Sequence, residues 1–308
     1  MRRRRDTATR QAGGGALRGI RAGGLAVVGI AVVATLVTVL VESEKGHTDG
    51  GLLAGGPASA TPYSGPLRVP HKEYDEDSQR ATEAESGAAG LALECEGDIR
   101  SGGFGGNWSK GDGGSTPAEG LEAYFDIEQP DVPRSGYRVE RDDGDRVLFS
   151  YDVGGRTKVA VIVAKDQPNR PGWGPETTAS CDPAEFPESF TDDQGYEVWT
   201  DARGRRLPVT TISSSQGSEH CDWQSAHFLA LGQGAKRALY ARDPEGVLSG
   251  LLTAPYDGDV TLPEGARDTG YRHGERELWL TADKKKAYVR TPDGVEAWPA
   301  VKKGMGCD

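Results

Sequence analysis

Three residues around the third cysteine are of the types that bind metals or transfer protons. His220 and Asp222 flank Cys221, and His227 follows seven positions after His220. Imidazole and carboxylate groups are common zinc ligands and common general acids and bases. In an extended strand, however, residues seven apart point to opposite faces, so the two histidines would not converge. We therefore expect no catalytic residues, no cofactor and no metal site. An envelope hydrolase or metal-dependent enzyme that uses these three residues stays open as an alternative.

Tryptophan side chains offer a second kind of chemistry, because an indole ring can stack on a sugar ring. Trp173 and Trp298 each precede a cysteine at matching places in the chain, which favours a packing role. Trp108, Trp199 and Trp223 have no such counterparts. These three are the candidate binding residues, and a cell-wall glycan is the ligand they suggest.

The four cysteines indicate how the chain is organised. Cys95 and Cys181 are 86 positions apart, and so are Cys221 and Cys307. Matching segments lie between them in the same order, such as Gly-Tyr-Arg at 136–138 and 270–272. We interpret this pattern as a tandem duplication. It predicts the disulfides Cys95–Cys181 and Cys221–Cys307, each of which closes its own module.

The elements that position these residues follow from caps, turns and apolar spacing. Thr116-Pro117 starts a helix that runs to about Glu128, with Leu121, Tyr124 and Phe125 on its apolar face. A matching helix is expected after Asp243-Pro244. The strands expected after these helices cover 136–141, 146–152, 157–164 and 173–181 in the first copy, and 277–282, 286–291 and 295–300 in the second.

The expected fold class is therefore α+β. Each module is a helix packed on a curved antiparallel sheet, by analogy with cystatin-like and NTF2-like folds. An extra hairpin, 196–201 and 207–212, precedes the second copy. The modules are expected at 91–185 and, with this hairpin, at 195–308.

The N-terminal region predicts a membrane anchor. Residues 22–41 contain no charged side chain and are long enough to span a bilayer as a helix. The seven arginines before this segment predict a cytoplasmic tail at 1–21 and an extracellular C-terminal region. Residues 42–90 are acidic and poor in aromatic residues, which predicts a disordered stalk. Within it, a loose helix is conceivable over 73–86.

The net charge of the chain limits the possible binding partners further. The net charge is −11, and the first 22 residues contribute +6, so the remainder carries −17. Such a surface repels phosphate backbones, which excludes nucleic acid as a partner. We expect a single-pass cell-membrane protein that binds or scaffolds outside the cell without catalysis, with a wall glycan or an envelope protein as partner. A regulatory ectodomain that acts through a membrane partner is a further alternative.

One resemblance supports the compartment. The segments His220–Ala226 and Gly294–Pro299 are similar to segments of uncharacterised membrane-anchored or secreted proteins of high-GC actinobacteria. The resemblance covers roughly residues 90–308. It implies a location outside the cytoplasm and a folded ectodomain, and it implies no activity and no functional residue.

Overall fold

The computed structural model describes residues 51–54, 61–70, 74, 76, 78–103 and 108–303. In this part of the chain no helix is long and apolar enough to cross a bilayer. The predicted membrane segment, 22–41, lies outside the described residues, as does the cytoplasmic tail. Both stay predictions.

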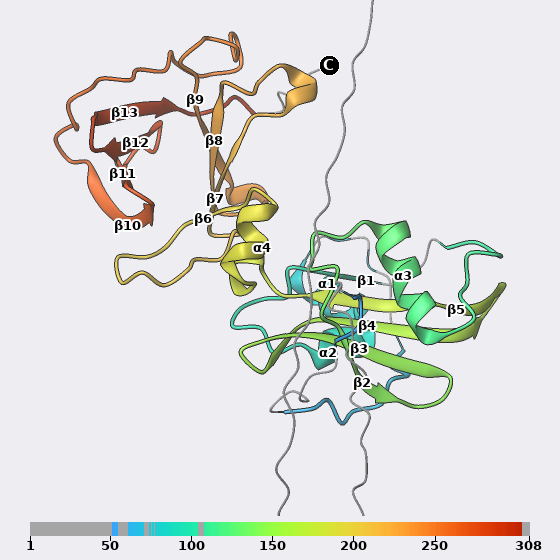
Figure 1. The fold of residues 1–308 in the computed structure, drawn as a ribbon. Coiled ribbons are helices and arrows are strands. Elements are labelled where there is room, and N and C mark those ends of the chain that lie inside the picture. The colour runs from blue at the N-terminus through green and yellow to red at the C-terminus, as the bar shows by residue number, and fades with distance from the viewer. Residues whose placement is uncertain are drawn as a thin grey trace, which may run out of the picture. The chain divides into compact units, whose positions relative to one another are not determined.

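The first half of the described chain is built on one antiparallel sheet of five strands (Figure 1). In spatial order these are β1 (Ser101–Gly103), β5 (Arg170–Ser180), β4 (Arg156–Gln167), β3 (Arg146–Val153) and β2 (Arg138–Asp142). The four strands expected here are confirmed. The α+β class with antiparallel sheets is confirmed as well.

Helix α3 (Pro117–Glu128) covers one face of this sheet. The Thr116 hydroxyl caps it by accepting from the backbone N–H of Glu119, as the sequence predicted. Its apolar face packs on every second residue of the strands beneath it. The core on this side includes Leu121, Tyr124, Phe125, Val147, Phe149, Val159, Val161 and Val163.

The packing on the opposite face of the sheet shows that the prediction of a disordered stalk over 42–90 is partly wrong. β4 is buried from Thr157 to Ala164, so its alternate residues Ala160 and Ile162 also need an apolar cover. Helices α1 (Gln79–Glu85) and α2 (Gly87–Ala92) lie in the segment expected to be disordered. Ala88, Ala89 and Ala92 of α2 pack on that face together with Leu67, which is 2% exposed. Part of 42–90 thus belongs to the fold, because a strand that is apolar on both faces requires two covering layers.

A still earlier segment joins the first sheet region through its backbone. The N–H of Tyr137 donates to the carbonyl of Leu52 at 2.9 Å, and the N–H of Ala54 donates to the carbonyl of Tyr137 at 2.7 Å. The Leu52 side chain packs against the α3 side of the core. The folded unit therefore includes residues well before Cys95.

A closed polar cluster lies across β2, β3 and β4. Arg138 donates from Nε to Asp152 at 2.7 Å and from Nη2 to Glu140 at 3.1 Å. The Ser150 hydroxyl also donates to Glu140, and Thr157 donates to Asp152 at 3.0 Å. The side chains of Arg138 and Glu140 are only 9% and 1% exposed. Every charge in this cluster is thus paired, and those of Arg138 and Glu140 are almost fully shielded from water.

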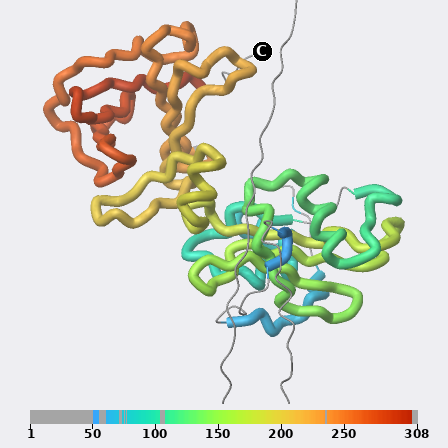
Figure 2. Tube along the Cα trace, in the orientation of Figure 1, coloured from blue at the N-terminus to red at the C-terminus, as the bar shows by residue number. Residues whose placement is uncertain are grey.

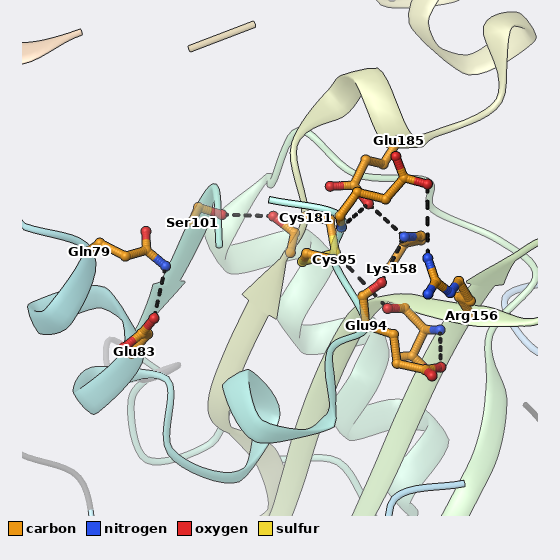
Figure 3. Close-up of a disulfide and its surroundings, with 12 residues drawn as sticks. Gln79, Glu83, Glu94, Cys95, Ser101, Arg156, Lys158, Cys181 and Glu185 are labelled. Carbon is orange, nitrogen blue, oxygen red and sulfur yellow. Dashed lines mark hydrogen bonds and ion pairs between the residues drawn. A yellow bond between two sulfur atoms is a disulfide. The ribbon is translucent and has the colours of Figure 1, made fainter. Parts of the chain in front are cut away.

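The disulfide Cys95–Cys181 is confirmed (Figure 3). Beside it, the buried Lys158 amine donates to the carbonyl of Glu94 at 2.8 Å and to the Glu185 carboxylate at 2.6 Å. The second predicted pair includes Cys307, which lies outside the described residues, so that pair stays a prediction.

The second half contains two antiparallel sheets, which Figure 2 traces from yellow to red. One sheet has the order β6 (Glu197–Val198), β7 (Ile212–Gln216), β8 (His227–Leu231) and β9 (Ala238–Arg242). The other has the order β10 (Arg267–His273), β11 (Arg276–Leu280), β12 (Lys286–Thr291) and β13 (Gly294–Pro299). The short helices outside the sheets are η1 (Pro183–Glu185), α4 (Glu188–Asp193), η2 (Glu219–Cys221) and η3 (Gly234–Lys236).

The prediction of a helix after Asp243-Pro244 is wrong. Residues 244–251 form turns instead, and the Asp243 carboxylate accepts from the backbone N–H groups of Val247 and Leu248, each at 2.9 Å. Gly246 and Gly250 take φ values of 74° and 82°, which a right-handed helix does not allow. The described residues of the second half therefore do not repeat the helix-on-sheet arrangement of the first. The strands expected within 277–300 are confirmed.

Candidate functional site

The two sheets of the second half share one apolar core, and a polar layer lies directly beside it. Each of six strands or strand ends places a core residue and, two positions away, a polar residue on the same face. The core members, all at most 1% exposed, are Trp199, Ile212, Leu229, Tyr240, Leu278 and Trp298. Their polar partners are Glu197, Ser214, His227, Arg242, Arg276 and Glu296.

Pairing between strands holds four of these polar residues side by side. Glu197 lies opposite Ser214 in the β6–β7 ladder, and His227 lies opposite Arg242 in the β8–β9 ladder. Ser214 is opposite Leu229, two positions from His227, which makes Ser214 and His227 diagonal neighbours on one face, and Glu197 lies one strand further on.

The polar layer borders a cavity of about 700 Å³. This volume lies within the ~300–1,000 Å³ of small-ligand sites. Five ionised side chains and two histidines line it: Glu197, Glu275, Glu296, Arg242, Arg276, His227 and His273. Polar uncharged residues and a few apolar ones complete the wall, among them Gln216, Gln224, Ser225, Thr291, Pro292 and Trp298.

Glu197 is the centre of the first hydrogen-bond network. Its carboxylate lies 2.9 Å from His227 Nε2 and accepts from Arg276 Nη1 at 3.2 Å and Nη2 at 3.3 Å. The Ser214 hydroxyl also donates to it, and Trp199 Nε1 donates to that hydroxyl at 2.8 Å. Burial raises the pKa of Glu197, but the hydrogen bonds from His227 and Ser214 and the nearby positive charges outweigh burial and lower the pKa to about 2.

The ionised state of Glu197 fixes the tautomer of His227. A carboxylate only accepts hydrogen bonds, so the proton of the 2.9 Å contact belongs to His227 Nε2. In the neutral ring Nδ1 is then a lone-pair acceptor, and among the described residues it has no hydrogen-bond partner. The Trp298 ring packs against the imidazole at a centroid distance of 5.9 Å and holds its orientation.

Glu296 and Arg242 form the second network. Arg242 Nε lies 3.1 and 3.2 Å from the two Glu296 oxygens, and Trp298 Nε1 donates to Glu296 at 2.7 Å. The Arg242 guanidinium also lies over the Tyr256 ring, 5.7 Å from its centroid. Both arginines of the cavity are therefore held in fixed positions by a carboxylate.

Two further groups complete the polar wall. Burial lowers the pKa of His273; the carboxylate of Glu197 opposes this effect, and repulsion from Arg276 adds to it. Ser225 has a buried hydroxyl with no hydrogen-bond partner among the described residues. A buried hydroxyl without a hydrogen-bond partner costs free energy, so the Ser225 hydroxyl is available to bond a polar group in the cavity.

The predicted histidine cluster does not form. His220 and Asp222 are exposed at η2, whereas His227 is half-buried in β8 and binds Glu197. Among the described residues, Cys95, Cys181 and Glu185 are the three that lie close enough together to hold a metal, and the two cysteines form the disulfide. The alternative in which His220 and Asp222 form a site together with His227 is therefore wrong.

The three tryptophan candidates occupy different environments. Trp108 is 2% exposed and donates from Nε1 to the carbonyl of Pro175 at 3.2 Å. Trp199 is fully buried under the polar layer. Neither has a free ring face for a sugar. The binding role predicted for these two residues is therefore wrong, and both belong to the core. Trp223 is half-buried and packs on Phe228 at a centroid distance of 5.9 Å, and its predicted binding role stays a prediction.

No family model, no curated protein and no solved structure matches this chain. The site therefore has to be interpreted from its own chemistry. Its fixed carboxylates and guanidinium groups can accept and donate hydrogen bonds to a polar ligand, and the His227–Glu197 pair can also accept a proton at Nδ1.

Proposed function

We propose that this protein is a non-catalytic binding protein of the cell envelope, and that the cavity beside the polar layer is its ligand site. Residues 22–41 anchor it in the membrane, with 1–21 in the cytoplasm and the folded region outside. The observation that carries the proposal is the ordered wall of the cavity: Glu197 and Arg276, and Glu296 and Arg242, hold one another in ion pairs. Groups that are fixed before binding lose little conformational entropy when the ligand arrives.

Three features support the compartment. The apolar segment 22–41 follows an arginine-rich tail. The Cys95–Cys181 disulfide is typical of proteins outside the cytoplasm. The equal cysteine spacing supports the duplication, in which the second half has lost its helix. Non-reducing peptide mapping tests that part, because it predicts Cys221 joined to Cys307.

The test of binding uses detergent-solubilised full-length protein and a soluble digest of cell-wall peptidoglycan. A ligand at 100 times its dissociation constant stabilises the folded state by ~2.7 kcal/mol, so the thermal midpoint should rise by several degrees. The variant Arg276→Met should lose this rise. An unchanged midpoint with the wall digest contradicts the proposal that the cavity binds a wall component.

A second candidate, an envelope hydrolase, is favoured by one observation, the imidazole of His227 whose Nε2–H is held by Glu197. This arrangement leaves Nδ1 to accept a proton from water or a hydroxyl group. Mass spectrometry of the wall digest after incubation distinguishes the candidates. New products that disappear with His227→Gln support the hydrolase, and an unchanged digest supports binding alone.

A further inference from the structure

The charges that line the cavity cancel in pairs, and this decides which ligands it accepts. Among the described residues, both arginines of the wall have a carboxylate partner within 3.3 Å. Glu275 adds a further carboxylate to the wall, and burial lowers the pKa of His273, which favours its neutral form. An anionic ligand would thus find both guanidinium groups already paired with carboxylates, and it would face the further carboxylate of Glu275.

The same pairs suit a neutral ligand with several hydroxyl groups. A hydroxyl both donates and accepts hydrogen bonds. A carboxylate next to a guanidinium offers an acceptor and a donor side by side, so two adjacent hydroxyls can be satisfied without breaking the ion pair. Gln216, Gln224 and Thr291 add uncharged donors and acceptors, and the buried hydroxyl of Ser225 has no partner of its own.

We infer that the ligand of this cavity is a neutral saccharide, held by its hydroxyl groups at the Glu197–Arg276 and Glu296–Arg242 pairs. This inference rests on the proposed binding function and specifies its ligand class. The sugar is bound mainly by hydrogen bonds at its edges, because Trp298, the aromatic ring of the wall, is itself 1% exposed.

The experiment titrates the detergent-solubilised full-length protein with neutral N,N′-diacetylchitobiose and follows calorimetry and tryptophan fluorescence. Glucuronate and inorganic phosphate are the anionic probes. We expect saturable binding of the neutral disaccharide and at least tenfold weaker binding of both anions.

Glu296→Gln keeps the shape of the side chain but removes the charge that pairs with Arg242, and it should weaken disaccharide binding by about tenfold. Glu277→Gln is the matched control. Glu277 also accepts from a tryptophan Nε1 two positions along its strand, at 3.3 Å, but it does not line the cavity. This control should bind the disaccharide as the wild type does.

The outcomes separate this inference from the proposed function. Stronger binding of glucuronate or phosphate, or equal loss in both variants, overturns the saccharide assignment. If the wall digest stabilises the protein and the neutral disaccharide does not bind, the binding function stands and the ligand class is wrong. If neither binds, both proposals fail.

Discussion

The two halves of the molecule each contain a cluster of one serine, one glutamate and one arginine, and the cluster of the second half borders a cavity. In the first half, Ser150 donates to Glu140, and Arg138 joins that glutamate to Asp152. In the second half, Ser214 donates to Glu197, and Arg276 pairs with it. The exposed fractions differ: Glu140 is 1% exposed and Glu197 is 22% exposed. The same residue types are thus shielded within a sheet in the first half and border a cavity in the second.

The largest effect that tests this comparison is expected at Arg138. Arg138→Met keeps most of the side-chain volume but leaves the buried Glu140 and the half-buried Asp152 without their cation. Breaking a buried pair in this way costs about 3–5 kcal/mol of unfolding free energy, measured by urea denaturation. Arg134→Met is the control, since its pair with Asp126 is exposed, and its cost should be about 0–1 kcal/mol. Equal losses in the two variants would contradict the sealed character of the cluster.

A smaller effect is expected from the titration of Glu197. Its pKa of about 2 in the folded state lies below the ordinary value of 4.5. A lowered pKa gives stability that is fully present above pH 4.5 and is lost as the pH falls toward about 2. The wild type should therefore be more stable than Glu197→Gln at neutral pH, and this difference should shrink as the pH falls through that window. A pH-independent difference between the two proteins would show that the ion pairs of Glu197 do not form.

Arg276 should matter less for stability than Arg138. Its side chain is 30% exposed, so water can solvate the carboxylate left behind in Arg276→Met. We expect a loss of about 1 kcal/mol by denaturation, in the range of partly exposed pairs. Ligand binding should fall much more than stability. A loss as large as that of Arg138→Met would make the second cluster a structural one.

The smallest effects are expected from two serines. Ser150→Ala removes a hydroxyl that donates to a buried carboxylate and should cost about 1 kcal/mol. Ser225→Ala removes a buried hydroxyl without a partner, so its effect on unfolding should be close to zero or slightly stabilising. In calorimetry, the same Ser225→Ala variant should weaken saccharide binding. A clear destabilisation by Ser225→Ala would indicate that this hydroxyl has a partner in solution.

Much of the first half could be predicted because its signals are local. The Thr116-Pro117 start of α3, the turn after β2 and the run of apolar residues in β4 lie within short segments. The prediction of disorder over 42–90 was partly wrong because it rested on composition alone. The small residues Ala88 and Ala89 are sufficient to cover a strand. The helix expected after Asp243-Pro244 does not form, because Gly246 and Gly250 take positive φ values and the Asp243 side chain caps a turn.

The site was harder to predict, because its members are far apart in the chain. His227 was identified, but its partners Glu197 and Arg276 lie 30 and 49 positions away. Sequence proximity favoured His220 and Asp222 instead. A signal was nevertheless present: several strands carry a polar residue two positions from a large apolar one, as in Glu197 and Trp199 or Glu296 and Trp298. Only the pairing of the strands shows that these positions share one layer.

The backbone pairing of Leu52 with Tyr137 shortens the segment that can link the first sheet region to the predicted membrane anchor. If the membrane segment ends at Val41 as the sequence predicts, the chain to Leu52 spans at most about 40 Å when fully extended. A free stalk up to residue 90 would have reached about 170 Å. If the anchor is as predicted, the first sheet region is tethered within this shorter distance of the bilayer surface and not within the longer reach of a free stalk.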